Sequence, residues 1–129
     1  MTRNKIPKPT ESELAILRVL WAEGPSTVRE VMNHLKPERV LGYTTVLKFL
    51  QIMTEKGLVS RDERQRSHVY SATRSEESTQ RELVTDLVTR AFGGSAQKLV
   101  LQALSSRKVS RDELREIRKE LEALERRNR

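Results

Sequence analysis

A short segment near the middle of the chain carries polar side chains at the spacing of one helical face, and their chemistry suits the edges of DNA bases. Threonine offers a hydroxyl and a methyl group, glutamine pairs with adenine, and lysine pairs with guanine or phosphate. A helix that enters the major groove reads bases with its N-terminal turns. On an isolated helix an ordinary solvated face is the commoner interpretation, so the prediction of DNA contact depends on the surrounding fold. The face comprises Tyr43, Thr44, Thr45, Lys48 and Gln51.

A second polar segment, residues 62–67, lies between two stretches with strand-like alternation and is typical of a hairpin tip. Arg61, Arg64 and Arg66 would contact phosphates or enter a minor groove there. Asp62 and Glu63 lower the net positive charge of this tip, so a solvent-exposed turn without a ligand is a serious alternative. Further cations would each suit a contact with the DNA backbone, and the sequence does not choose among them: Lys5, Lys8, Arg29, Lys36 and Arg39.

No arrangement of residues in the sequence suits catalysis or metal binding. The chain has no cysteine, which excludes disulfides, thiolate zinc sites, iron–sulfur clusters and cysteine nucleophiles. His34 and His68 lack further ligands at suitable spacing and are more simply interpreted as structural. No Ser–His–acid arrangement, isolated carboxylate pair or phosphate-binding glycine loop stands out. We therefore expect a protein with no catalytic residue, no metal and no cofactor, which is not an enzyme.

Two helices are expected before the segment that suits DNA. Thr10 and Glu13 form a capping-box pattern, after which apolar residues recur at helical spacing up to Trp21, a residue expected in the core. Ser26 is expected to cap a second, shorter helix that Pro37 closes.

A third helix and a hairpin complete a small domain. The third helix should run from about Tyr43 to Lys56, with Gly57 as its stop. Residues 58–61 and 68–71 then alternate as two short strands around the basic tip. Three helices followed by a hairpin predict a winged helix-turn-helix over residues 1–74, in a protein that is mainly α with a small β-hairpin.

Residues 75–129 return to a helical pattern and predict a C-terminal helical dimerisation domain. Gly93-Gly94 closes one helix, and Ser110 with Glu113 forms a capping box that opens the last one. Three short amphipathic helices after a complete domain would leave much apolar surface exposed to water in a monomer. A homodimer that shares these helices as one core removes that surface from water.

The charge distribution favours an anionic partner. The chain has 129 residues with 25 Lys and Arg against 18 Asp and Glu, a formal net charge of +7. Residues 1–74 hold 13 basic and 8 acidic side chains, a net of +5, so most of the excess lies in the expected winged helix. No stretch of eighteen apolar residues would span a membrane, and the basic N-terminus lacks the apolar run of a signal peptide. We expect a cytoplasmic protein that binds double-stranded DNA.

Several short motifs in fixed order resemble the penicillinase-repressor (BlaI/MecI) family of bacterial transcriptional regulators. The resemblance covers roughly residues 10–125, and although each fragment alone is weak, the ordered set is specific. The fragments are Glu13-Leu14-Ala15-Ile16-Leu17-Arg18-Val19-Leu20-Trp21, Gly42-Tyr43-Thr44-Thr45-Val46, Glu55-Lys56-Gly57-Leu58-Val59, His68-Val69-Tyr70, Phe92-Gly93-Gly94-Ser95 and Leu99-Val100-Leu101.

The resemblance implies a homodimeric winged-helix repressor that binds a short inverted repeat with TACA/TGTA-like half-sites in the promoters it controls. Carried over by position, it assigns DNA contacts in the recognition helix to Tyr43, Thr44, Thr45, Lys48 and Gln51, and in the wing to Arg64, Arg66 and His68. It assigns the dimer core to Leu87, Phe92, Leu99, Leu104, Leu114, Ile117 and Leu121.

In antibiotic-responsive members of that family, a membrane-bound zinc metallopeptidase sensor signals β-lactam and the repressor is cleaved in its dimerisation region. Relief by proteolysis linked to such a sensor is therefore implied here. Gln102-Ala103 stands where those members have the cleaved Asn–Phe bond, and Ile52-Met53 stands where many relatives have Arg-Leu. The cysteine motif of the family's copper-responsive branch is absent, which argues against copper sensing.

Two other functions fit the same sequence. A winged helix can serve as a protein-interaction module without touching nucleic acid, although the net charge of the first half argues against this. The second alternative is a DNA-binding repressor that is released by a small-molecule effector between the lobes of a dimer, although the sequence indicates no convergent polar pocket for one.

Overall fold

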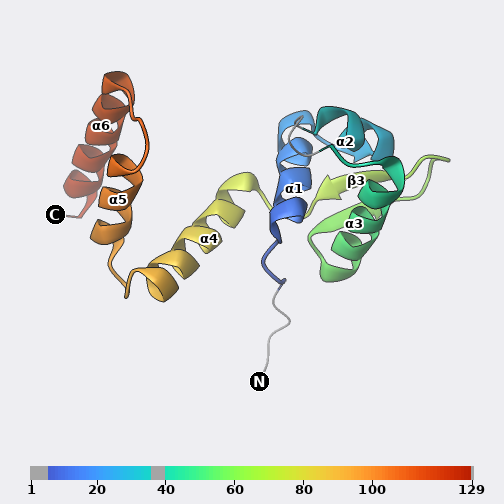
Figure 1. Ribbon diagram of the computed structural model, residues 1–129, viewed down its shortest axis with the longest axis horizontal. Helices are drawn as coiled ribbons and strands as arrows, with labels where there is room; N and C mark the ends of the chain where they lie inside the picture. The colour runs from blue at the N-terminus through green and yellow to red at the C-terminus, as the bar shows by residue number, and fades with distance from the viewer. Residues whose placement is uncertain (1–5, 36–39, 129) are drawn as a thin grey trace. The chain divides into compact units, whose positions relative to one another are not determined.

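The computed structural model describes residues 6–35 and 40–128, and the chain divides into two compact units, Met1–Leu83 and Val84–Arg129. Three helices and three short strands precede α4 (Glu76–Ala91) in the described part of the chain. Figure 1 colours the elements by their order along the chain. The first unit has the element order of a winged helix-turn-helix, as predicted. The expected domain boundary after residue 74 lies just before α4, whose first two turns belong to the first unit.

The first helix, α1 (Glu11–Glu23), begins at the predicted capping box. The Thr10 hydroxyl accepts from the Glu13 amide at 3.3 Å, and the Glu13 carboxylate accepts from the Thr10 amide at 2.9 Å. These two bonds satisfy donors that have no partner inside the helix.

The second helix, α2 (Val28–His34), corrects the predicted cap. Thr27 is its N-cap, and Glu30 completes a capping box by accepting from the Thr27 amide at 2.8 Å. Ser26 is not available for this role, because its hydroxyl donates to the Gly24 carbonyl at 2.8 Å. The predicted stop at Pro37 lies outside the described residues.

The third helix, α3 (Tyr43–Lys56), has the predicted bounds. Gly57 ends it in the left-handed region, with φ of 84°, which favours glycine. The Leu58 amide donates back to the Met53 carbonyl at 2.9 Å, closing a Schellman-type cap.

The wing is part of a three-stranded antiparallel sheet. Strands β2 (Val59–Asp62) and β3 (Val69–Ala72) each begin one residue later than predicted, and for β2 the reason is that the cap of α3 uses the Leu58 amide. A two-residue strand, β1 (Ser26–Thr27), pairs with the other edge of β3 and gives the order β1-β3-β2. The sequence predicted only the hairpin, because two residues are too few for a visible alternation.

One hydrophobic core joins these elements. The side chains of this core come from all three helices, both wing strands and the residue before β2, and each of them is at most 8% exposed. Tyr70 lies under the wing with 1% exposure, and Trp21 packs at the edge of the core, where its Nε1 donates to the Arg74 carbonyl at 3.0 Å. The core comprises Ile16, Leu17, Val19, Leu20, Val28, Val31, Val46, Leu50, Met53, Leu58, Val59 and Tyr70.

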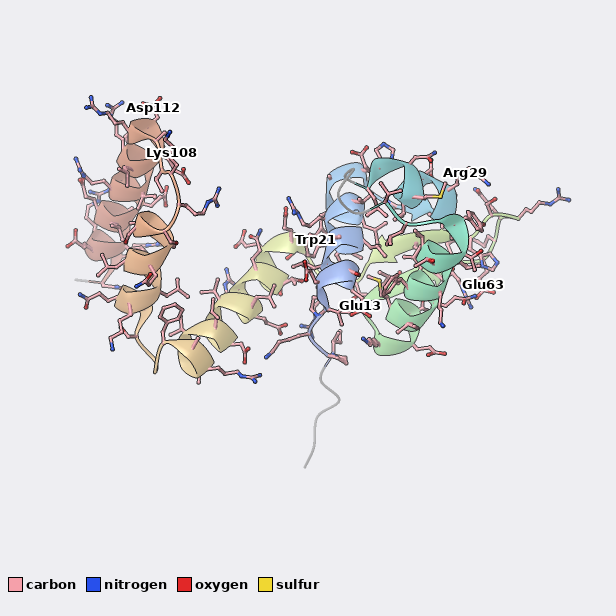
Figure 2. All side chains as sticks on the ribbon, viewed as in Figure 1. Glu13, Trp21, Arg29, Glu63, Lys108 and Asp112 are labelled. Carbon is pink, nitrogen blue, oxygen red and sulfur yellow. The ribbon has the colours of Figure 1, made fainter. Side chains whose placement is uncertain are left out.

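An ion pair between a buried carboxylate and a partly exposed lysine connects the ends of two helices inside this unit. The Glu13 side chain is 2% exposed, and the Lys56 Nζ lies 2.8 Å from its Oε2. Burial alone would raise the pKa of Glu13, but the hydrogen bonds from Lys56 and Thr10 outweigh it and hold that pKa below its usual value. The pair therefore fastens the start of α1 to the end of α3; Glu13 is labelled in Figure 2.

The second unit lacks a comparable core. It contains the end of α4 together with α5 (Ala96–Ser105) and α6 (Arg111–Arg127), which begin at the N-caps Ser95 and Ser110. No residue of α5 or α6 is buried. Among the described residues, no helix is long and apolar enough to cross a membrane.

Candidate nucleic-acid interface

The core fixes which face of α3 points outward. Val46, Leu50 and Met53 are fully buried and hold one side of the helix against the rest of the unit. The opposite side is the predicted reading face, and every one of its side chains is exposed: Tyr43, Thr44, Thr45, Lys48 and Gln51. The structure therefore places five predicted contact residues together on one accessible surface.

The N-terminal end of α3 differs from those of α1 and α2. Its N-cap, Gly42, makes no side-chain hydrogen bond, and its first turn contains no acidic residue. In α1 and α2, by contrast, carboxylates in the first turn compensate the positive end of the helix dipole. Within the described residues, the first turn of α3 thus offers no carboxylate to the positive end of its dipole, which suits an anionic surface such as a DNA backbone.

In the wing, the predicted contact Arg64 is already paired. Its side chain is 88% exposed, yet its NH2 lies 2.7 Å and its Nε 3.0 Å from the carboxylate oxygens of Asp62. The hydrogen bonds from the Arg64 side chain and amide hold the pKa of Asp62 at about 2. Asp62 therefore stays ionised at any physiological pH and competes with phosphate for this guanidinium.

Arg61 is paired in the same manner. The Arg61 NH2 lies 2.7 Å from the Glu63 carboxylate. The pKa of Arg61 is raised, mainly by the hydrogen bond to Glu63 and next by that to Tyr70, its partner across the strand pair. Arg66 is exposed and has no carboxylate partner within residues 6–35 and 40–128. Among the described wing residues, Arg61 and Arg64 are paired with carboxylates, and Arg66 is the arginine whose guanidinium is available to an anionic ligand.

A hollow of about 400 Å³ lies where α2, α3 and the wing meet. It brings together three predicted contact residues, one from the helix and two from the wing: Tyr43, Arg66 and His68. None of the described residues that line it is acidic. The other predicted residues, Thr44, Thr45, Lys48, Gln51 and Arg64, do not line this hollow.

Arg29 completes the hollow from α2. Its Cζ lies 5.3 Å from the centre of the Tyr43 ring, within the range of a cation–π contact. Arg29 is one of the five cations predicted as candidate contacts to the DNA backbone. The sequence contains no reason to prefer it, because no local sequence pattern predicts that α2 places it over the Tyr43 ring. Lys5, Lys36 and Arg39 from the same group lie outside the described residues. Arg29 is labelled in Figure 2.

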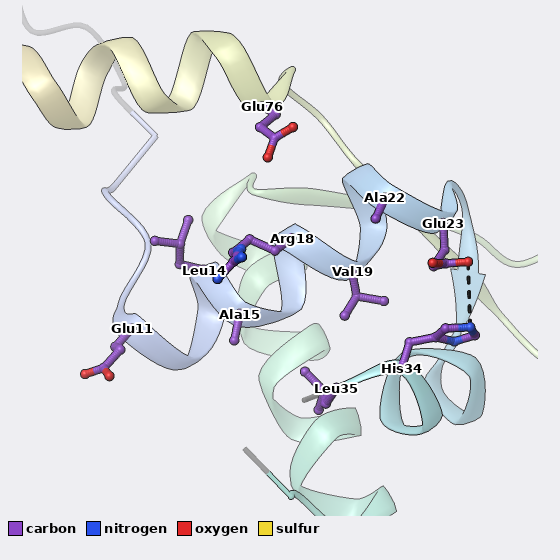
Figure 3. Close-up of a pocket in the computed structure, with 10 residues that line it drawn as sticks. All are labelled: Glu11, Leu14, Ala15, Arg18, Val19, Ala22, Glu23, His34, Leu35 and Glu76. Carbon is purple, nitrogen blue, oxygen red and sulfur yellow. Dashed lines mark ion pairs between the residues drawn. The ribbon is translucent and has the colours of Figure 1, made fainter. Parts of the chain in front are cut away.

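A second hollow, of about 500 Å³, lies between α1, α2 and the start of α4 (Figure 3). Its rim mixes Glu11, Glu23 and Glu76 with Arg18 and His34, so it lacks the uniform charge of the first hollow. His34 Nδ1 lies 2.8 Å from the Glu30 carbonyl and its Nε2 lies 3.6 Å from Glu23. His34 thus has the local role that its position at the end of a helix predicted. The described residues contain no group of three metal-binding side chains.

The predicted dimer residues occupy the second unit and the helix that leads into it. Leu87, Leu114 and Leu121 are 48%, 40% and 50% exposed. The remaining four are half-buried: Phe92, Leu99, Leu104 and Ile117. Further apolar side chains are exposed on the same helices: Val84, Val100, Leu101 and Leu124. Gln102 and Ala103, the candidate cleavage site, are exposed on α5.

Similarity to known proteins extends over nearly the whole chain. The penicillinase repressor family model matches residues 9–123. The transcriptional regulator BlaI of Mycobacterium tuberculosis is 30% identical over 122 residues, covering 94% of this chain and 88% of that protein. The penicillinase repressor of Bacillus licheniformis is 25% identical over 118 residues, covering 92% of each. The solution structure of the DNA-binding domain of the repressor BlaI aligns with 56% of this chain and 88% of its own, at 25% identity and a TM-score of 0.49.

Proposed function

The chain belongs to the penicillinase repressor family, and we propose that it is a homodimeric DNA-binding transcriptional repressor that acts on an inverted-repeat operator. The observation that carries this proposal is the exposed polar face of α3, flanked by a hollow whose described lining has three basic residues and no acidic one. A face of this composition at the N-terminal end of a recognition helix matches the major-groove edges of bases. The names of its relatives, a transcriptional regulator and a penicillinase repressor, support the same conclusion.

Within this proposal, the residues divide into two roles. Side chains of α3 read base edges, with Thr45, Lys48 and Gln51 on the open face. Basic residues around them, Arg66 and His68 in the wing, contact the backbone and set the register without reading sequence.

The homodimer is part of the proposal, and the exposed apolar side chains of α4, α5 and α6 support it. Burying these in a second copy would remove them from water, and each fully buried leucine contributes about 1.5–3 kcal/mol. A two-fold dimer presents two recognition helices, which explains why the operator should be an inverted repeat.

Release of the operator is proposed to follow proteolysis linked to a membrane-bound zinc metallopeptidase sensor, with Gln102–Ala103 as the candidate bond. A protease needs an extended chain, and this bond lies inside α5. Cleavage therefore requires that α5 open locally, which in the proposed dimer also frees the apolar side chains that this helix gives to the interface. Cleavage would separate the two DNA-binding units and remove the gain in affinity that linkage gives them.

Selection from a random duplex library by the purified protein, at physiological salt, tests the proposed function. We expect recovery of a short inverted repeat. Recovery of unselected DNA, or of none, would contradict sequence-specific binding and favour the protein-interaction module.

A variant of α3 tests the reading face in the same selection. Thr45→Ala should relax the preference at one position of each half-site, because a hydroxyl and a methyl contact are lost. Thr85→Ala removes an equally exposed threonine from α4 and should leave the selected sequence unchanged. An unchanged preference in Thr45→Ala would show that Thr45 does not read bases.

The mode of release has its own test. Incubation with the sensor peptidase should cut the repressor and release labelled operator DNA. If the chain remains intact while DNA is released, proteolysis is excluded and a small-molecule effector becomes the explanation.

A further inference from the structure

The hollow between α2, α3 and the wing differs in the charge of its lining from two other hollows on the described part of the chain. Its described ionisable lining consists of Arg29, Arg66, His68 and two tyrosines, without a carboxylate. The hollow beside α1 includes three glutamates, and one along α6 includes two. In a chain with 18 acidic residues, the absence of any from this lining concentrates positive charge at one place.

The carboxylates nearest in sequence to these cations are occupied elsewhere. Glu30 follows Arg29 directly, but its carboxylate accepts from the Thr27 amide at 2.8 Å. In the wing, Asp62 holds Arg64 and Glu63 holds Arg61. Arg29 and Arg66 therefore have no ion pair within the described ranges, and both guanidinium groups have donors left for an external anion.

The contact with Tyr43 gives Arg29 a defined position. A long exposed arginine ordinarily samples many rotamers, and ordering it opposes binding. With Cζ 5.3 Å from the centre of the Tyr43 ring, the guanidinium is already held over the start of α3. The Arg29 side chain is exposed, so its N–H donors can reach an anion beside the start of α3, and a guanidinium binds phosphate through such charge-assisted hydrogen bonds.

We propose that this hollow is a phosphate-binding notch, in which Arg29, held against the Tyr43 ring, contacts one DNA backbone phosphate beside Arg66 and His68. The ligand class is a phosphodiester of duplex DNA. The inference rests on the proposed function and deepens it, since it assigns a backbone contact to α2 and a supporting role to Tyr43. Tyr43 is a positioning residue here, because it acts on phosphate through Arg29.

The test compares Arg29→Gln with the wild-type protein on two labelled duplexes, one selected by the wild type from the random library and one of scrambled sequence. We expect Arg29→Gln to bind both about tenfold more weakly, the loss for one charge-assisted hydrogen bond. The slope of log affinity against log salt should fall in magnitude by about 0.9, the value for one phosphate of B-DNA. The ratio between the duplexes should stay constant, because phosphate carries no sequence information.

Arg18→Gln is the matched control, since it removes the same charge from an exposed arginine that lines the other hollow. It should change neither the affinity nor the salt slope beyond the general effect of one net charge. Thermal melting followed by circular dichroism confirms that each variant is folded. Arg66→Gln repeats the measurement at the second cation of the notch and should also lower the salt slope.

Methylphosphonate replacement locates the contact. Each phosphate of the selected duplex is replaced in turn by an uncharged methylphosphonate. At the notch phosphate, the replacement should weaken Arg29→Gln clearly less than the wild type, because one partner of that phosphate is already lost while Arg66 and His68 remain. A scan that is identical in both proteins at every phosphate would overturn the notch.

The stacking contact is tested by a double-mutant cycle. Tyr43→Leu should reduce the contribution of Arg29 to affinity by about threefold, in line with an exposed cation–π contact. Strict additivity would remove Tyr43 from the notch.

Failure of the notch and failure of the proposed function give different results. If the wild type binds neither duplex in a salt-dependent manner, the proposed function is wrong and the notch falls with it. If the wild type selects and binds a repeat, but Arg29→Gln keeps the full affinity and salt slope, only the notch is wrong.

Discussion

The two units of this chain differ in how much of their apolar side-chain surface they bury. The first buries twelve hydrophobic side chains in one core and leaves a polar face on α3 exposed. In the second, α5 and α6 bury no residue, and five of their large apolar side chains are 40% to 55% exposed: Val100, Leu101, Leu114, Leu121 and Leu124. A unit with a closed core can devote its surface to a ligand. A unit without one has an apolar surface whose simplest use is to meet another copy of itself.

The largest expected effect distinguishes a core leucine from an exposed one. Leu50→Ala should lower the free energy of unfolding by about 2–5 kcal/mol, because the side chain is fully buried and leaves a cavity. Urea denaturation followed by the fluorescence of Trp21, the one tryptophan of the chain, reports on the first unit. Leu101→Ala, a 55% exposed site in α5, should change that transition by less than about 0.5 kcal/mol. Similar effects of the two changes would break the comparison.

The Glu13–Lys56 ion pair of the first unit gives the next largest effect. Glu13→Gln should cost about 1–3 kcal/mol at neutral pH, since it removes a charge-assisted hydrogen bond from Lys56. The folded-state pKa of Glu13 lies below its usual value of 4.5, so its contribution is complete above that pH and is lost as the pH falls through the lowered pKa.

The variant should therefore lose part of the acid sensitivity of the wild type. Urea denaturation at neutral and at acidic pH measures both quantities. Glu55→Gln, at an exposed position of α3, is the control and should retain the wild-type pH profile. A Glu13→Gln protein with unchanged stability at neutral pH would show that the pair contributes nothing.

The exposed face of the second unit should matter for association. Leu121→Ala is expected to weaken the dimer about tenfold, because two copies each lose a side chain that dimerisation would bury. Sedimentation equilibrium at micromolar concentration measures this. Val40→Ala trims a large apolar side chain that, at 81%, is the most exposed of its kind among the described residues of the first unit, and it should leave association unchanged. A wild-type protein that sediments as a monomer would contradict the dimer itself.

The smallest effect concerns the balance of charge in the wing. Asp62→Asn should release Arg64 for phosphate and raise affinity for scrambled DNA by about threefold, with a salt slope steeper by about 0.9. Because the pKa of Asp62 is about 2, the carboxylate is ionised between about pH 5 and 8, and wild-type binding gains no pH dependence from it there. Adding Arg64→Gln should cancel the gain. No gain in Asp62→Asn would show that the pairing does not restrain Arg64.

Local signals in the sequence predicted much of the first unit. The bounds of α3 followed from its apolar stripe and Gly57, and the start of α1 from the capping box at Thr10. The same rule could have corrected the start of α2, because Thr27 and Glu30 also have capping-box spacing. Strand β1 escaped prediction, since two residues become a strand only through pairing with β3, more than forty residues away.

The candidate site was predictable in its residue types but not in its pairings. The polar face of α3 is a property of one helix and could be assigned from spacing alone. The contact of Arg29 with Tyr43 depends on how α2 crosses α3, and the engagement of Arg64 by Asp62 depends on the shape of the hairpin tip. Such contacts form between elements, where sequence periodicity carries no information.

The central claim is that the first unit binds DNA and the second unit pairs two copies of the chain. Its most direct test is the ratio of affinities for a duplex with two half-sites and a duplex with one. The comparison uses the wild-type chain and a Leu114→Glu, Leu121→Glu variant. The wild type should favour the two-site duplex by about 10²-fold or more, because the second half-site is bound at high effective concentration. The variant should bind both duplexes with the single-site affinity of the wild type. A variant that keeps the full preference would show that the second unit does not pair the two DNA-binding units.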